Sequence, residues 1–350
     1  MSETITIDGR LVGKKQPCFI IAEAGVNHNG DITLAHKLID SASSAGADAV
    51  KFQSFITEEL ITPDAPKADY QIETTGKSGS QYGMLKALEL TAEQQAELKR
   101  HCDDVNIIYT CTPYEHTSID LLDKIDIPVY KVASTDTTNI PFLRYMASKG
   151  RPIILSTGMC TMGEVEEAVL AIQNNEYAIL QCTSEYPVPY SDLNLKAMDT
   201  LQLAFNCPIG FSDHTSGIGA SPWAVALGAS IIEKHFTLDR NMTGPDHRAS
   251  IEPDELKQLI QTIRNVEIAM GDGIKRPMPS EIKNKSRMQK SLVIRHAIDK
   301  GEILTAENLT AKRPGDGLPP SWFDRVIGKK THQAISAGSI LRLSDIDWES

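Results

Sequence analysis

The sequence lacks the features that mark membrane-spanning and exported proteins. No apolar run in its 350 residues approaches the roughly 20 residues that a helix needs to cross a bilayer. The first ten residues, MSETITIDGR, contain no apolar core of the kind found in signal peptides. We therefore expect a cytoplasmic protein that does not bind membranes.

Paired cysteines and a surplus of basic residues are also missing. The chain has six cysteines, but no two of them form a Cys-x-x-Cys pair. This spacing suggests neither a zinc knuckle nor a disulfide framework. The formal net charge of −11 argues against general binding of nucleic acid. It does not exclude a small anionic substrate, because a few local Lys or Arg residues can reverse the field inside one cleft.

What the sequence does contain is a regular alternation of short apolar runs and helical patterns. The apolar runs are residues 18–24, 47–53, 106–112, 128–134, 152–158, 177–183, 208–213 and 230–236. Strands that alternate with helices indicate parallel β/α units. Eight such units, ending near residue 271, predict an α/β fold with a (β/α)8 TIM barrel. A doubly wound sheet is the weaker alternative, because no G-x-G-x-x-G motif follows the first run.

Different patterns flank the predicted barrel. Residues 4–13 resemble a hairpin with Asp-Gly at its turn, which we expect to plug the bottom of the barrel. We assign residues 1–275 to the barrel and its hairpin, 276–290 to a basic linker, and 291–350 to a small second domain of short strands. Such a small domain buries little core of its own, so we expect it to lean on another surface.

The apolar runs end in polar side chains, and in a barrel these ends converge on one face. The candidates at or just beyond these ends are Glu23, Lys51, Gln53, Thr110, Thr112, Lys131, Ser134, Ser156, Thr183, Ser212, Asp213, His214, Glu233 and His235. Two lysines and several hydroxyls facing one cavity suit a phosphate or a carboxylate. The alternative is that the lysines form ion pairs with Glu23 or another carboxylate, which is compatible with a site.

The two histidines at neighbouring strand ends suggest a metal site. Adjacent strands lie about 4.8 Å apart, so His214 and His235 can reach one ion. With Glu23 or water in other positions, the pair suits Mn²⁺, Mg²⁺, Zn²⁺ or Fe²⁺. A catalytic acid–base pair or two core histidines fit the pattern about as well. His28 is a third participant or a loop cap, and Asp246 lies either near the mouth or in a surface turn.

Several long motifs carry a family resemblance. They are IAEAGVNHNGD, GADAVKFQSF, ILSTGM, CTSEYP, GFSDHTSG and IEKHFTLDRNMTGPDHRASIEPDEL. Together they closely resemble the sialic acid synthase family, also called N-acetylneuraminate or nonulosonic acid synthases. The motif KRPGDG and its surroundings resemble the family's C-terminal antifreeze-like (SAF, β-clip) domain. The resemblance covers nearly the whole chain in order.

The resemblance implies a reaction and a cofactor. It implies condensation of phosphoenolpyruvate with an N-acylated hexosamine such as N-acetylmannosamine, giving N-acetylneuraminate and phosphate by C–O cleavage. It implies a divalent metal at His214 and His235, Mn²⁺ in the first place and Mg²⁺ or Co²⁺ otherwise. Glu23 matches a catalytic carboxylate. Arg313 matches an arginine that reaches into the partner's barrel in a domain-swapped homodimer.

The same resemblance implies which residues bind each substrate. The positions that match the phosphate and carboxylate site are Lys51, Thr112, Lys131, Ser134, Ser156 and Ser212. Gln53, Tyr186 and Asp246 match sugar-contacting positions.

Departures from the family pattern fall on what we expect to be the sugar side. Asp136 and Ser184 stand in the predicted sugar site, and Gln181 departs as well. These departures leave a legionaminic acid synthase, which uses 2,4-diacetamido-2,4,6-trideoxymannose, as the alternative. The GPDHRAS loop makes a pseudaminic acid synthase less favoured.

Three other functions stay open at this point. They are a 3-deoxy sugar acid synthase, a metal-dependent barrel hydrolase, and a non-enzymatic protein that binds ice or carbohydrate through its C-terminal domain.

Overall fold

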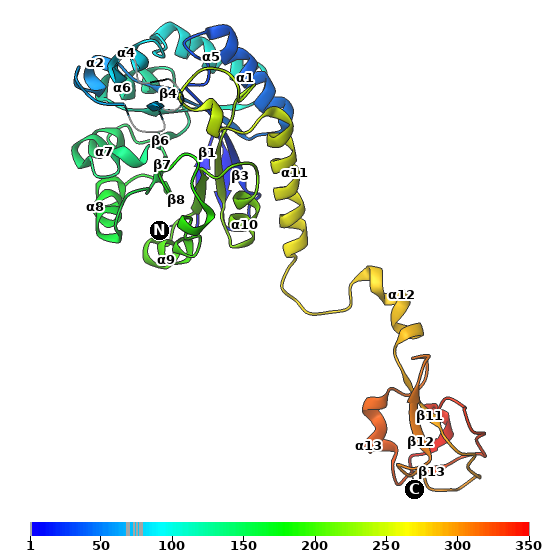
Figure 1. The fold of residues 1–350 in the computed structure, drawn as a ribbon. Coiled ribbons are helices and arrows are strands. Elements are labelled where there is room, and N and C mark those ends of the chain that lie inside the picture. The colour runs from blue at the N-terminus through cyan, green and yellow to red at the C-terminus, as the bar shows by residue number, and fades with distance from the viewer. Residues whose placement is uncertain (1, 68–70, 73, 75, 77–79, 350) are drawn as a thin grey trace. The chain divides into compact units, whose positions relative to one another are not determined.

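The eight predicted strands close into a single parallel barrel in a computed structural model, which describes residues 2–67, 71, 72, 74, 76 and 80–349 (Figure 1). The strands are β3 (Phe19–Gly25), β4 (Ala49–Ser54), β5 (Ile108–Pro113), β6 (Tyr130–Val132), β7 (Ile153–Ser156), β8 (Tyr177–Cys182), β9 (Ile209–Asp213) and β10 (Ile231–His235). Their order is sequential, and β10 pairs with β3 to close the ring. This confirms the predicted (β/α)8 barrel.

Amphipathic helices cover the outside of the barrel. They are α1 (Ile32–Ala45), α5 (Ala92–Asp104), α6 (His116–Lys124), α7 (Ile140–Ala147), α8 (Met162–Ile172), α9 (Ala197–Phe205), α10 (Ala220–Ala226) and α11 (Pro253–Met270). Their apolar faces and the outward-facing strand residues form one large core. Strands buried on both faces consist of near-continuous apolar residues until they reach the carboxyl end of the barrel, where polar residues begin.

Two elements depart from the simple alternation. Between β4 and α5, the described residues include the short helices α2 (Thr57–Leu60) and α4 (Gln81–Lys86). At the N-terminus, β1 (Thr4–Ile7) and β2 (Arg10–Gly13) pair antiparallel, as predicted for the hairpin. The buried hairpin residues Ile5, Ile7 and Val12 pack with inward-facing residues near the amino ends of the barrel strands. The hairpin therefore closes the end opposite the polar strand termini.

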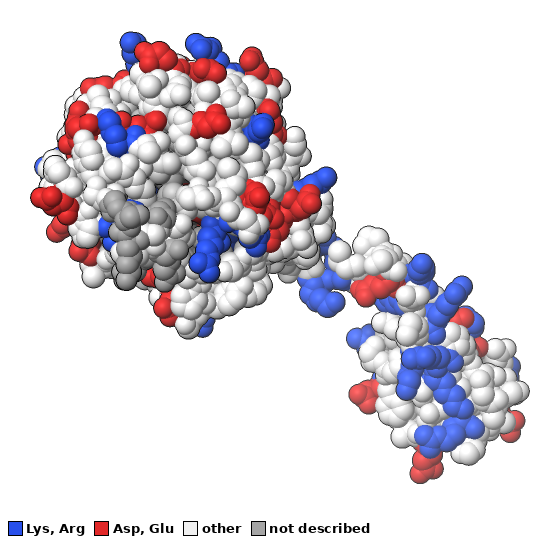
Figure 2. Space-filling view, turned by 45° about the horizontal axis from the view of Figure 1, so that its top comes forward, with Lys and Arg blue, Asp and Glu red and all other residues white. Residues whose placement is uncertain are grey.

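The chain divides into two compact units, Met1–Gly271 and Asp272–Ser350. The second unit contains the paired strands β11 (Ser291–Ile294) with β12 (Leu309–Lys312), and β13 (Lys330–Thr331) with β14 (Ile346–Asp347). Helix α13 (Phe323–Val326) lies between the two pairs in sequence. A small apolar core is formed by Leu292, Ile294, Ile298, Leu304, Leu309, Leu318, Val326, Ile335, Leu341 and Ile346. Figure 2 shows Lys and Arg side chains gathered on one face of this unit.

The segment predicted as a linker contains a helix, α12 (Pro279–Met288). Pro279 occupies the first turn, where a missing N–H is tolerated, and the Glu281 carboxylate accepts a hydrogen bond from the Met278 amide at 2.9 Å. Proline and basic residues suggested a linker, but this order of residues also starts a helix. No helix within the described residues is long and apolar enough to cross a membrane.

Candidate active site

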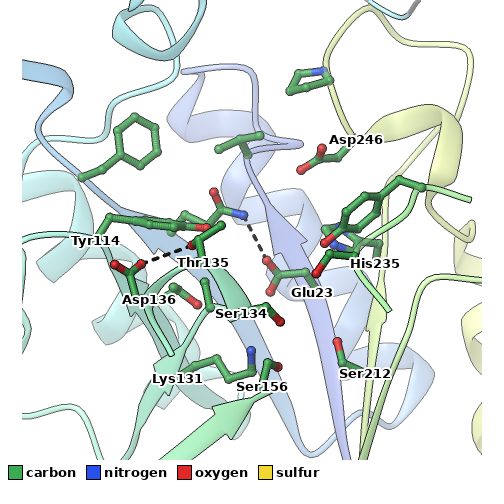
Figure 3. Close-up of a pocket in the computed structure, with 18 of the residues that line it drawn as sticks. Glu23, Tyr114, Lys131, Ser134, Thr135, Asp136, Ser156, Ser212, His235 and Asp246 are labelled. Atoms are coloured by element: carbon green, nitrogen blue, oxygen red, sulfur yellow. Dashed lines mark hydrogen bonds between the residues drawn. The ribbon is translucent and has the colours of Figure 1, made fainter. Parts of the chain in front are cut away.

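The carboxyl ends of the barrel strands surround a cavity of about 620 Å³ (Figure 3). The residues predicted to bind a substrate or metal, or to act in catalysis, line it with the exceptions of Arg313 and Gln181. These lining residues are Glu23, Lys51, Gln53, Thr112, Lys131, Ser134, Asp136, Ser156, Ser184, Tyr186, Ser212, His214, His235 and Asp246. Arg313 belongs to the second unit, where its Nε donates to the carbonyl of Met288 at 3.0 Å.

Two buried lysines and two buried carboxylates form the floor of the pocket. Lys51 Nζ lies 2.8 Å from Glu23 Oε2 and 3.7 Å from Glu233 Oε2. Lys131 Nζ lies 3.3 Å from Glu233 Oε1, which also accepts a hydrogen bond from Ser212 Oγ at 2.8 Å. The lysines thus form ion pairs and also line the pocket. The ion-pair interpretation of the sequence is therefore compatible with the anion-site interpretation.

Glu233 is a strand-end candidate to which the family resemblance assigned no role. It forms ion pairs with both Lys51 and Lys131, and it lines the pocket. A signal for it existed in the sequence. Glu233 stands two positions before His235, and alternate residues of a strand face the same side.

The two floor carboxyls titrate very differently. Burial raises the pKa of Glu23, and the nearby Lys51 offsets this only in part, so that the pKa is about 7. Burial also acts to raise the pKa of Glu233, but Lys131, Lys51 and the Ser212 hydroxyl together lower it to about 2. Glu233 is therefore a permanent anion that holds the lysines. Glu23, whose other oxygen accepts from Gln53 Nε2 at 3.3 Å, can exchange a proton near neutral pH.

The two histidines lie next to each other at the carboxyl ends of β9 and β10, with ring centroids 5.6 Å apart. His214 Nδ1 lies 2.7 Å from the carbonyl oxygen of Thr183, which only accepts, so this nitrogen carries the proton. The lone pair of His214 therefore lies on Nε2. Burial lowers the pKa of His214 to about 4 and that of His235 well below its usual value, so both rings are neutral.

These residues fit one side of a metal site. Neutral imidazole is a good ligand for a divalent ion, and the Nδ1 atom of His235 is buried without a hydrogen-bond partner. Across residues 2–67, 71, 72, 74, 76 and 80–349, no group of three or more His, Cys, Asp or Glu side chains is arranged to hold an ion. Two protein ligands leave positions for water or substrate oxygens, as catalytic ions require.

Gly25 allows three polar side chains to converge above the floor. It lies at an irregularity in the pairing of β3 with β4 and has a φ of +52°. A Cβ atom there would lie 3.1 Å from Glu23 Oε1, 3.3 Å from Gln53 Nε2 and 3.6 Å from Asp246 Oδ2. The absence of that atom lets the three groups share one space. Burial raises the pKa of Asp246 to about 6.

Comparison with known proteins agrees with this geometry. The NeuB family matches residues 38–275, and the SAF domain matches residues 289–347. The chain belongs to the NeuB family. The resemblance to sialic and related nonulosonic acid synthases is thereby confirmed, as is the antifreeze-like C-terminal domain.

Individual NeuB-family relatives carry more specific names. An N,N'-diacetyllegionaminic acid synthase of Campylobacter jejuni is 49% identical over 92% of this chain and 98% of its own length. The N-acetylneuraminate-9-phosphate synthase of Homo sapiens is 39% identical over 92% of this chain and 90% of its own. A crystal structure of an N-acetylneuraminic acid synthetase from Leptospira borgpetersenii has a TM-score of 0.72 at 36% identity, covering 81% of this chain and 95% of that one.

Behind the pocket of this NeuB-family barrel, a second ion pair holds the histidine-bearing strands together. Lys234 and Asp213 are partners in the β9–β10 register, and their charged atoms lie 3.1 Å apart with both side chains fully buried. Asp213 also accepts from the Thr215 amide at 2.8 Å and from Ser221 Oγ at 2.6 Å. Each residue lies next to a histidine in sequence but points the other way, so the pair fixes the ends of both strands.

One side chain does not take the place that the sequence suggested, and a second takes one of the two places that were left open for it. Gln181 was expected on the sugar side, but it does not line the pocket, and its Nε2 donates to the Leu193 carbonyl at 3.1 Å. It lies one position before the pocket residue Cys182, so strand alternation turns it outward. His28 is a loop cap, because its Nδ1 accepts from the Gly30 amide at 3.0 Å and it does not line the pocket.

Proposed function

We propose that this synthase condenses phosphoenolpyruvate with an N-acetylated mannosamine-type sugar, giving a nine-carbon 2-keto acid and phosphate. One observation carries the proposal. A single pocket combines a cationic, hydroxyl-bearing floor at Lys51 and Lys131 with two neutral imidazoles at its side. The floor suits the phosphate and carboxylate of phosphoenolpyruvate, and the imidazoles suit a divalent ion.

In the proposed reaction, carbon 3 of phosphoenolpyruvate forms a bond to the aldehyde carbon of the open-chain sugar. The aldehyde oxygen takes up a proton and becomes a hydroxyl. Water then adds to the electron-poor carbon 2, and the bond between carbon 2 and the phosphate oxygen breaks. One water is consumed, and phosphate leaves with its bridging oxygen.

Residues of this chain supply most of what these steps need. Lys51 and Lys131 bind the oxyanions, with hydroxyl donors from Ser134, Ser156 and Ser212 around them. Glu23, with a pKa of about 7, accepts the proton of the attacking water. A divalent ion, Mn²⁺ in the first place or else Mg²⁺ or Co²⁺, held by His214 and His235, would polarise the aldehyde oxygen as a Lewis acid.

For the acceptor, we favour 2,4-diacetamido-2,4,6-trideoxymannose, which makes the product of the legionaminic type. The sequence alone placed N-acetylmannosamine first and this sugar second. The higher identity to a legionaminic acid synthase than to an N-acetylneuraminate-9-phosphate synthase supports the reverse order.

The deciding experiment offers the metal-free protein phosphoenolpyruvate and Mn²⁺ with each sugar in parallel. Phosphate release and the mass of the product are measured. We expect turnover with the diacetamido sugar in excess over N-acetylmannosamine, and phosphate that retains the bridging ¹⁸O of labelled phosphoenolpyruvate. Phosphate release from phosphoenolpyruvate without either sugar would instead indicate a metal-dependent hydrolase.

The metal site has its own test. His235→Ala should lose binding of Mn²⁺ and lower kcat about 1,000-fold, because Lewis-acid catalysis contributes several kcal/mol. His36→Ala is the matched control, since His36 lies on α1 and pairs with Glu97 at 2.8 Å outside the pocket. Circular dichroism checks that both variants fold. Full activity of metal-free His235→Ala would contradict the proposal.

A further inference from the structure

One side of the pocket is apolar. We call it the apolar wall and define it as Phe55, Leu60, Ile61, Met84 and Leu85. All five belong to the segment between β4 and α5, which contains the short helices α2 and α4. Apart from Ile61, they pack with Val26, Leu88 and Tyr114 in a small hydrophobic cluster that is separate from the cores of the barrel. The wall is thus a local addition to the barrel and not an exposed part of its core.

The wall differs in chemistry from the rest of the pocket. Within the described residues, its segment contributes five apolar side chains and the amides Gln71 and Gln81 to the lining, and no charged group. Leu60, Ile61, Met84 and Leu85 are only partly buried. Partly exposed apolar surface in a concave site gains free energy when an apolar ligand group covers it.

The wall also lies at a defined place relative to the reacting centre. Its cluster includes Tyr114, which Figure 3 shows across the pocket from His235. In the proposed reaction the aldehyde carbon of the sugar lies at the histidine side, beside the floor. A six-carbon sugar anchored there by carbon 1 extends its carbons 4 to 6 away from the histidines, toward the opposite side.

The two candidate sugars differ at those distant carbons. N-acetylmannosamine carries a hydroxyl on carbon 4 and a hydroxymethyl group as carbon 6. The diacetamido trideoxy sugar carries an acetamido group on carbon 4 and a methyl group as carbon 6. Apolar contacts favour the two methyl groups, whereas a hydroxyl buried there without a partner is disfavoured.

We propose that the apolar wall determines acceptor specificity by holding the carbon-4 acetamido and carbon-6 methyl groups of the sugar. This inference rests on the proposed function and deepens it. The wall also disfavours a sugar phosphorylated on carbon 6, because a phosphate held against these apolar side chains would lose its hydration. Carbon 6 of the sugar becomes carbon 9 of the product, the position named for the human relative.

The test compares kcat/KM for the two sugars in full-length wild type, Leu60→Asn, Ile61→Thr and Leu60→Asn/Leu85→Asn. A single polar substitution should lower the ratio of diacetamido sugar to N-acetylmannosamine about tenfold, and the double variant about 100-fold. The KM for phosphoenolpyruvate should stay within about twofold of wild type, since the floor is untouched. Leu203→Asn is the matched control, because Leu203 is 86% exposed on α9 and does not line this pocket.

The outcomes separate the two proposals. A ratio that falls in the wall variants but not in Leu203→Asn supports the wall, and a misfolded variant cannot mimic it because both sugars would then lose equally. Equal losses for both sugars in variants that circular dichroism shows to be folded, or wild type without preference for the diacetamido sugar, contradict the role of the apolar wall and leave the proposed synthase function intact. Wild type that turns over neither sugar overturns the proposed function itself.

Discussion

The barrel unit and the C-terminal unit differ in the sign of their net charge and in where their Lys and Arg side chains lie. Residues 1–271 contain 21 Lys and Arg against 36 Asp and Glu, whereas residues 272–350 contain 14 against 10. The acidic unit nevertheless buries several lysines, and the basic unit leaves its Lys and Arg partly or fully exposed. Net charge therefore says little about where charge acts. In the barrel, the buried minority of cations defines the site.

Burying a charged side chain costs free energy, so the difference in buried charge between the two units is informative. A buried ion pair often contributes no more stability than an apolar replacement of similar volume would. Among its described residues, the barrel has two such groups, the floor around Glu233 and the Lys234–Asp213 pair behind it. The described part of the C-terminal unit buries one charged side chain, Asp345, and satisfies it with the Arg342 amide at 2.8 Å and Gln333 Nε2 at 2.9 Å. We infer that function, and not stability, retains the charges of the barrel.

The largest expected effect is on stability. Lys234→Met should lower the free energy of unfolding by about 3–5 kcal/mol, because it leaves Asp213 buried without its cation. The matched substitution in the other unit, Arg342→Met, should change it by no more than about 0.5 kcal/mol, since its partner Asp316 is exposed and 3.8 Å away. Urea unfolding of the full chain measures both. Equal effects would remove the contrast between the units.

A smaller effect comes from the carboxyl of Asp246, and it depends on pH. Its folded-state pKa, about 6, lies above its usual value, so the folded protein holds this proton more tightly than the unfolded chain. Its contribution to stability is therefore complete below pH 4 and is lost as the pH rises through 6. The loss should reach about 3 kcal/mol at pH 7.

Replacing Asp246 by Asn should remove this part of the pH dependence. Asp246→Asn should be more stable than wild type at pH 7, equal to it near pH 4, and less active, because the amide keeps the shape but not the charge at the proposed sugar site. Thermal unfolding between pH 4 and 8 checks the first two outcomes. A pH profile identical to that of wild type would show that Asp246 is not a buried carboxyl.

The smallest expected effect is that of removing the Arg313 side chain. It tests whether the C-terminal unit of one subunit completes the barrel site of another. The resemblance places Arg313 in the partner's pocket of a domain-swapped homodimer, and losing one charged hydrogen bond there should lower kcat/KM about 10–100-fold. Glu23→Gln should be inactive for a different reason, because it lacks the carboxylate that accepts the proton of the attacking water. Each variant alone therefore has little activity.

Mixing the two variants after dissociation sharpens that test. In a swapped dimer, one site of each mixed pair receives Glu23 from one chain and Arg313 from the other. Random pairing should restore about a quarter of wild-type activity. No recovery from a mixture that forms dimers would mean that each C-terminal unit serves its own barrel or none.

Much of the fold and part of the site followed from pattern alone. The eight apolar runs predicted the barrel because parallel strands need a helix between them, and the hairpin followed from its Asp-Gly turn. The polar strand ends predicted the pocket because all eight carboxyl ends lie on the same face. The helix in residues 279–288 was missed, since its proline and basic residues suit a linker as well as a first turn.

The sequence by itself determined the order of the strands and the set of residues that meet at their ends. The tertiary structure decided what those residues do to each other. It made Glu233 the anion shared by two lysines and left Glu23 with a pKa of about 7. It also turned Gln181 away and placed an apolar wall beside the floor. The reason is physical: periodicity along one chain sets the direction of a side chain, but pairing and burial depend on distances between strands far apart in the sequence.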